Sequence, residues 1–68
     1  MQIKAKKNFS TTRIKNGFSV TALAKEAHLN ASVVLRTEKG SPARPSTAKK
    51  ICEAMKEDFD TLFEITGE

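Results

Sequence analysis

The clearest periodic pattern in the chain predicts an amphipathic helix that starts after Ser19. Apolar residues recur there at positions i, i+3, i+4 and i+7, which places them on one helix face. They are Val20, Leu23, Ala24 and Ala27. Ser19 is a favourable N-cap, because its hydroxyl oxygen can accept a hydrogen bond from a first-turn N–H. The apolar stripe breaks at Leu29, so we expect this helix to end at His28.

A second helix is expected after a turn of about three residues. Asn30 is another favourable N-cap, and Gly40 should end the helical segment 31–39, because glycine readily adopts the left-handed conformation found after helices. Two helices joined by so short a turn form a helix-turn-helix. This arrangement occurs in DNA-binding proteins and also in helical hairpins with a purely structural role, and the pattern alone leaves both open.

Three further short helices complete the predicted architecture. One covers about 9–16 and ends at Asn16-Gly17, one is capped by Ser46 after a loop that contains both prolines, and a short one is capped by Asp58. The helix after Ser46 again has apolar residues at helical spacing: Ala48, Ile51, Cys52 and Met55. Apart from a weak alternation within 3–7, the chain has no strand pattern, so the prediction is all-α.

Five short helices with brief links predict a compact bundle rather than a long four-helix one. We expect a basic, flexible or partly ordered arm over 1–8, one domain over 9–64 and a tail over 65–68. Four phenylalanines should bring both chain ends into one core: Phe9, Phe18, Phe59 and Phe63. A chain of 68 residues buries only about 60% of its unfolded surface, so its stability should be modest.

Charge is distributed unevenly along the chain. Residues 1–50 carry eleven Lys or Arg against two acidic residues, a local charge of +9, whereas residues 51–68 carry one Lys against six acidic residues, a local charge of −5. Such a protein can present one face to a polyanion such as nucleic acid. A basic face is more often ordinary solvated surface, so the charge supports nucleic-acid binding only together with a motif.

The reactive side chains predict neither catalysis nor a bound cofactor. Cys52 is the only cysteine and His28 the only histidine, so the chain cannot form an intramolecular disulfide or complete an ordinary zinc site. No nucleophile has an evident base beside it in the pattern, so we expect no enzyme activity. The chain also has no apolar run of membrane-spanning length, and we expect a cytoplasmic protein.

Over residues 9–64 the chain resembles the Cro/CI-type (XRE-like) helix-turn-helix domains of phage repressors and bacterial transcriptional regulators. The residues that carry the resemblance are Arg13, Gly17, Ser19, Leu23-Ala24, Val34, Glu38, Gly40, Arg44-Pro45 and Leu62-Phe63. The resemblance implies a lambda-repressor-like bundle that binds operator DNA through its third helix. It also implies a structural ion pair between Arg13 and Glu38.

Four residues depart from the family pattern: His28, Val20, Thr37, which stands where a larger aliphatic residue is usual, and Lys39, which stands where asparagine is common. His28 stands where the family usually has a glycine in left-handed conformation, which histidine tolerates at some cost. Val20 replaces a glutamine that many relatives direct at a DNA phosphate. That anchor is therefore absent here, although Ser19 and the neighbouring Thr21 remain at the start of the second helix.

Within the third helix, four residues lie away from the predicted core and should face the major groove: Ala31, Ser32, Leu35 and Arg36. Arg36 can pair bidentately with guanine, whereas Ala31 and Leu35 offer apolar contact to thymine methyl groups. Leu35 could equally be an isolated surface apolar residue. Phosphate contacts are expected from Lys39, Arg44, Ser46, Thr47, Lys49 and Lys50, and further DNA contacts from Ser19, Thr21 and Asn30.

The predicted function is sequence-specific binding of double-stranded DNA by a small transcriptional regulator, with homodimerisation either through the bundle or only on DNA. The alternative is a protein-interaction module, such as an antitoxin-like component, that uses the same fold. Its basis is the apolar set Ala31, Val33 and Leu35. Salt separates the two, because phosphate binding weakens steeply as salt rises, whereas an apolar protein interface hardly responds.

Overall fold

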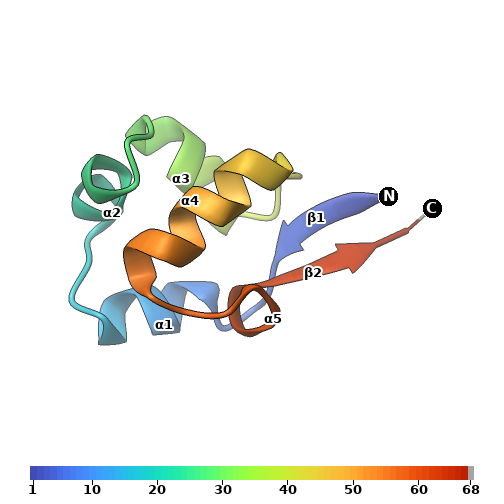
Figure 1. Cartoon of the computed structure of the whole chain (residues 1–68), viewed down its shortest axis with the longest axis horizontal. Helices are drawn as coiled ribbons and strands as arrows, with labels where there is room; N and C mark the ends of the chain where they lie inside the picture. Colours follow the sequence, from blue (N-terminus) through green and yellow to red (C-terminus); the bar gives the residue numbers. More distant parts are fainter. Residues whose placement is uncertain (68) are drawn as a thin grey trace.

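The structure is a computed structural model that describes residues 1–67 (Figure 1). This part of the chain contains α1 (Phe9–Lys15), α2 (Val20–Glu26), α3 (Ala31–Glu38), α4 (Pro45–Met55) and α5 (Phe59–Leu62), with strands β1 (Gln2–Ala5) and β2 (Phe63–Thr66). The helix-rich bundle was predicted. The all-α prediction was wrong, because the two strands pair into a sheet.

The helix starts follow the capping residues in part. The Ser19 hydroxyl oxygen accepts a hydrogen bond from the Ala22 N–H at 3.0 Å, as a first-turn cap requires. Asn30 occupies the N-cap position of α3 without a side-chain cap hydrogen bond. The expectation that Ser46 caps α4 was wrong, since α4 begins at Pro45 with Arg44 at the N-cap. Proline suits the first helical position, where its missing N–H costs nothing.

The sheet joins the two ends of the chain. β1 pairs antiparallel with β2, and the register places Ile3 opposite Ile65 and Ala5 opposite Phe63. The strands thus occupy Gln2–Ala5, within the segment expected to be an arm, and Phe63–Thr66, which runs into the expected tail. Strands of four residues are too short for an alternating pattern to stand out in the sequence. The pairing that defines them is long-range and has no local signal.

Further hydrogen bonds hold the N-terminal segment against α5. The Lys6 N–H donates to the Leu62 carbonyl at 2.8 Å, and the Asn8 side-chain amide donates to the Thr61 carbonyl at 3.1 Å. The Lys6 ammonium group also donates to the Asp60 carbonyl. Residues 1–8 are therefore bound to the last helix rather than extended as a flexible arm.

The core lies between the helices and the inner face of the sheet. Its buried members are Ile3, Phe9, Leu23, Ala24, Val34, Ala48, Ile51, Met55, Leu62 and Phe63. The Phe63 ring contacts Phe9 edge-on at a centroid distance of 5.7 Å and stacks on Phe59 at 5.5 Å. Aromatic pairs in these geometries add about 0.5 to 1.5 kcal/mol beyond their burial. The predicted role of these rings in joining both chain ends is confirmed.

The molecule is elongated, with extents of 33 × 20 × 18 Å. Figure 1 shows the strands and both chain ends at one extremity of the long axis and α2 toward the other, with α3 and α4 on the side away from α1. α2 therefore lies away from the sheet, whereas α3 still contacts β1.

Candidate nucleic-acid interface

The turn between α2 and α3 fixes the direction in which α3 leaves α2. The Leu29 N–H donates to the Ala24 carbonyl at 2.8 Å, which closes the last turn of α2. His28 adopts the left-handed conformation with φ 59°, at the position where the resemblance implied it. A non-glycine residue in this region carries some strain, and histidine is among the residues that tolerate it. The chain then reverses within a few residues into α3.

The two faces of α3 differ completely in burial. Val34 is 0% exposed and Thr37 is 3% exposed, so this side of the helix packs into the core. Ala31, Ser32 and Arg36 are exposed, and Leu35 is 41% exposed. The predicted groove-facing residues therefore share the outward face of one helix. This face offers a guanidinium group, a hydroxyl group and two apolar side chains to a partner.

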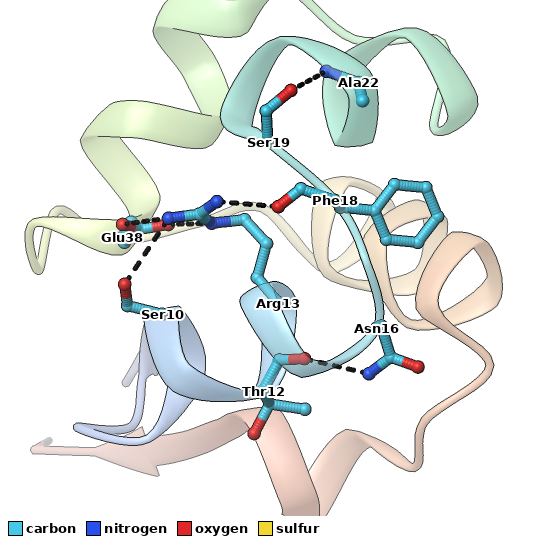
Figure 2. A network of polar contacts seen from close by, with 8 residues as sticks. All are labelled: Ser10, Thr12, Arg13, Asn16, Phe18, Ser19, Ala22 and Glu38. Atoms are coloured by element: carbon cyan, nitrogen blue, oxygen red, sulfur yellow. Dashed lines mark hydrogen bonds and ion pairs between the residues drawn. The ribbon is translucent and has the colours of Figure 1, made fainter.

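A bidentate ion pair holds the end of α3 against α1 (Figure 2). Arg13 Nε lies 2.7 Å from Glu38 Oε1, and Arg13 Nη2 donates to Glu38 Oε2 at 3.1 Å. The two side chains are only 11% and 17% exposed. Two parallel hydrogen bonds between charged groups at low exposure fix orientation as well as distance. The pair implied by the resemblance is thus present and sets the position of α3.

The same arginine also fixes the start of α2. Arg13 Nη1 donates to the Phe18 carbonyl at 2.8 Å, and the Phe18 N–H donates back to the Arg13 carbonyl at 3.1 Å. Arg13 Nη2 lies 3.4 Å from the Ser10 hydroxyl oxygen. Figure 2 shows this guanidinium group between α1, the α1–α2 turn and the end of α3. One side chain therefore links the three segments that orient the helix-turn-helix.

A hollow of about 470 Å³ runs beside α3. It lies between α3 and the loop that leads into α4. Arg36, Arg44 and Thr47 line it together with Leu29, Val33, Thr37, Ser41, Pro42 and Ala43. Two arginines at the edge of a concave surface favour an anionic group there, because both carry positive charge at neutral pH. The structure thus brings the predicted groove contact Arg36 next to two of the predicted phosphate contacts.

The other predicted contact residues are distributed around this region. Those that are exposed are Ser19, Thr21, Asn30, Lys39, Ser46 and Lys49. Lys49 does not line the hollow beside α3. It lines a second hollow, of about 460 Å³, together with residues of the sheet, α4 and α5. The structure therefore does not bring Lys49 together with Arg44 and Thr47, although all three lie in or next to the first turns of α4.

The second hollow was not predicted from the sequence. Cys52 and Ile65 contribute to its lining, and burial raises the pKa of the Cys52 thiol, with the negative charges of Asp58 and Glu53 adding to the shift. The alternation Phe63-Glu64-Ile65-Thr66 was the available signal for the strand that forms one wall. It spans four residues, too few to distinguish a strand from the end of a helix.

Within residues 1–67, no group of three or more His, Cys, Asp or Glu side chains is arranged to hold a metal ion. None of the helices in this part of the chain is long and apolar enough to cross a membrane.

The structure is a small helical bundle in which the second helix of a helix-turn-helix exposes one face, with Arg36 and Arg44 beside it. These features are those of helix-turn-helix DNA-binding domains. The model of one such family, described as Cro/C1-type HTH DNA-binding domain, matches residues 8–68. The chain belongs to this family, which confirms the resemblance seen in the sequence. No curated protein and no solved structure matches the chain.

Proposed function

We propose that this chain regulates transcription by binding a specific DNA sequence, with the exposed face of α3 in the major groove. The observation that carries the proposal is the arrangement of Ser32, Leu35 and Arg36 on the outward face of a helix whose other face is buried. A helix of this kind fits the width of the major groove. The family supports DNA binding, and the outward side chains supply the means of reading sequence.

Each outward side chain of α3 has a base-edge chemistry that suits it. Arg36 can donate two hydrogen bonds to the O6 and N7 atoms of a guanine. Ser32 can donate or accept, and therefore suits several bases. Ala31 and Leu35 can pack on thymine methyl groups, which gives a function to a leucine that is 41% exposed.

Phosphate contacts would fix the position of the protein on the duplex. Arg44 and Thr47 beside the hollow next to α3 are the strongest candidates, because a phosphate seated there would also lie near Arg36. Further candidates are Ser19, Thr21, Asn30, Lys39 and Ser46, all of them exposed. Lys49 becomes the weakest candidate, since it lines the other hollow.

The test is selection of bound sequences from a random pool of duplexes, with wild type and Arg36→Ala compared at two salt concentrations. We expect wild type to enrich a defined motif and Arg36→Ala to lose about 1 to 3 kcal/mol of discrimination at one guanine position. Lys15→Ala is the matched control, since it removes one exposed basic charge from α1, across α4 from α3 (Figure 1).

Three outcomes would contradict the proposal. Equal loss by Arg36→Ala on every sequence would remove the base-reading role of Arg36. If wild type bound all duplex sequences equally, its contacts would be with the phosphate backbone and not with the bases. Absence of salt-sensitive binding would favour the alternative in which α3, with Leu35 at its centre, grips a protein partner.

A further inference from the structure

The loop between α3 and α4 lies against the first strand of the sheet. The Ala43 N–H donates to the Ile3 carbonyl at 2.8 Å, and these two residues form an isolated antiparallel bridge. Ile3 also pairs with Ile65 of β2. Because a strand residue has one neighbour on each side, Ala43 lies along the edge of β1 that β2 leaves open. The loop thus extends the sheet by one residue, in the order β2, β1, Ala43.

This bond is the one attachment of the loop to a distant part of the backbone. The Ser41 N–H donates to the Arg36 carbonyl at 3.0 Å, which closes the end of α3. Pro42 has no N–H to donate. Arg44 is already the N-cap of α4. Among the backbone hydrogen bonds within residues 1–67, only that of Ala43 joins the loop to something other than its two flanking helices.

The strand that supports the loop is itself firmly held. Ile3 is 8% exposed and belongs to the core, and Ala43 packs against that core. All four residues of β1 pair with β2 on the other edge. The Lys6 N–H, directly after the strand, donates to the Leu62 carbonyl at 2.8 Å. The loop therefore rests on a part of the molecule that is fixed by both apolar packing and hydrogen bonds.

The position of the loop determines the shape of the hollow beside α3. Four consecutive loop residues, 41–44, line this hollow, and Arg36 of α3 lines it as well. Arg44 directly follows Ala43, so the Ile3–Ala43 bond lies one residue away from a predicted phosphate contact. A shift of the loop away from β1 would change the separation between Arg44 and Arg36.

We propose that β1 is a positioning strand for the DNA interface, which it serves by holding Arg44 in place through the Ile3–Ala43 bond. The inference rests on the proposed function, since it concerns how the phosphate contact of Arg44 is prepared. A side chain that is in place before binding loses less conformational entropy when it binds. Without the bond, the cost of ordering the loop falls on the binding step and lowers affinity by about threefold to tenfold.

The test removes this one hydrogen bond and leaves the side chains unchanged. A chain of 68 residues is accessible to chemical synthesis, so Ala43 can be replaced by L-lactic acid, which keeps the methyl group and exchanges the N–H for an ester oxygen. Binding to the random duplex pool should weaken about threefold to tenfold. The same replacement at Ala54, inside α4, is the matched control and should leave DNA affinity unchanged. Circular dichroism establishes that both esters are folded.

A second comparison separates a positioning role from a general loss of stability. Arg44→Ala should weaken the wild-type chain and the Ala54 ester alike, but should have little further effect on the Ala43 ester, because that ester acts through Arg44. Fully additive losses from Arg44→Ala and the Ala43 ester would overturn the proposal, as would equal losses of affinity in the two esters.

A measurement without DNA distinguishes failure of this inference from failure of the proposed function. The backbone order parameter of Arg44, from nitrogen-15 relaxation, should be high in wild type and in the Ala54 ester and should fall in the Ala43 ester. An unchanged order parameter in the Ala43 ester would overturn the positioning role by itself. Absence of duplex binding by wild type would instead contradict the proposed function.

Discussion

The two ends of the long axis share one apolar core but differ in the polar contacts that accompany it. At the helix-turn-helix end, the Arg13–Glu38 ion pair holds α3, and the hydrogen bond from Arg13 to the Phe18 carbonyl holds the turn that leads into α2. At the strand end, Phe63 packs between Phe9 and Phe59, and the two chain ends close into a sheet. Directional polar contacts fix an angle, whereas apolar packing contributes most of the stability. The comparison indicates that the ion pair orients the helix-turn-helix, while the apolar core, which reaches from Phe63 to Leu23 and Val34, holds both ends together.

The largest effect should come from the strand end. Phe63→Ala removes a ring that is 0% exposed and that contacts two other rings, so we expect a loss of about 3 to 5 kcal/mol in the free energy of unfolding. Urea unfolding followed by circular dichroism measures it. Leu35→Ala, on the exposed face of α3, is the control and should change stability by no more than about 0.5 kcal/mol. A similar loss in both variants would break the distinction between the two ends.

Glu38→Ala should have the next largest effect, a loss of about 3 kcal/mol in the free energy of unfolding. This value is near the lower end of the cost of removing one partner from a buried ion pair. The reason is that Arg13 would remain nearly buried without its carboxylate, although it would keep its bond to the Phe18 carbonyl. Glu26→Ala, which removes an exposed carboxylate from α2, provides the comparison in the same urea experiment. A loss below about 1 kcal/mol would show that the pair behaves as a surface ion pair.

A smaller effect is expected on DNA binding from residues at the start of α4. Arg44→Ala should weaken binding to all sequences alike and reduce the slope of log K against log salt by about one unit. Lys49→Ala should change that slope less, because Lys49 lines the hollow at the strand end rather than the one beside α3. Titrations at several salt concentrations measure both slopes. A larger change for Lys49→Ala would reverse this assignment.

The smallest effect concerns the thiol at the strand end. Burial, together with Asp58 and Glu53, raises the pKa of Cys52, so alkylation by iodoacetamide should reach half its maximal rate at a higher pH than in the urea-unfolded chain. Because the folded state retains the proton longer, stability should fall as pH rises through the unfolded pKa toward the folded one. Cys52→Ser should lack that alkaline decline. Identical alkylation profiles for folded and unfolded chain would contradict the shift.

The helical part of the fold could be predicted because its signals are local. The apolar stripe of α2, the cap at Ser19 and the left-handed stops at Gly17 and His28 all act within a few residues of one another. The outward face of α3 follows from the same periodicity once Val34 is assigned to the core.

The sheet could not be predicted because its cause is long-range. Gln2–Ala5 and Phe63–Thr66 become strands by pairing with each other across almost the whole chain. Each is too short to show a periodicity of two over several repeats. The same limit hid the position of Lys49, since the hollow that it lines exists only after β2 has formed.

On α3, the residues that hold the helix in place are different from those that face away from it. Val34, Thr37 and Glu38 anchor the helix, and the ion pair reaches Arg13, 25 positions earlier in the chain. Ala31, Ser32, Leu35 and Arg36 take no part in that anchoring. Under the proposed function, substitutions at these four outward positions would alter what the helix recognises while its support remains intact. Because the anchoring residues and the outward residues of α3 are different, the outward ones could change, by evolution or by design, without a change in the fold.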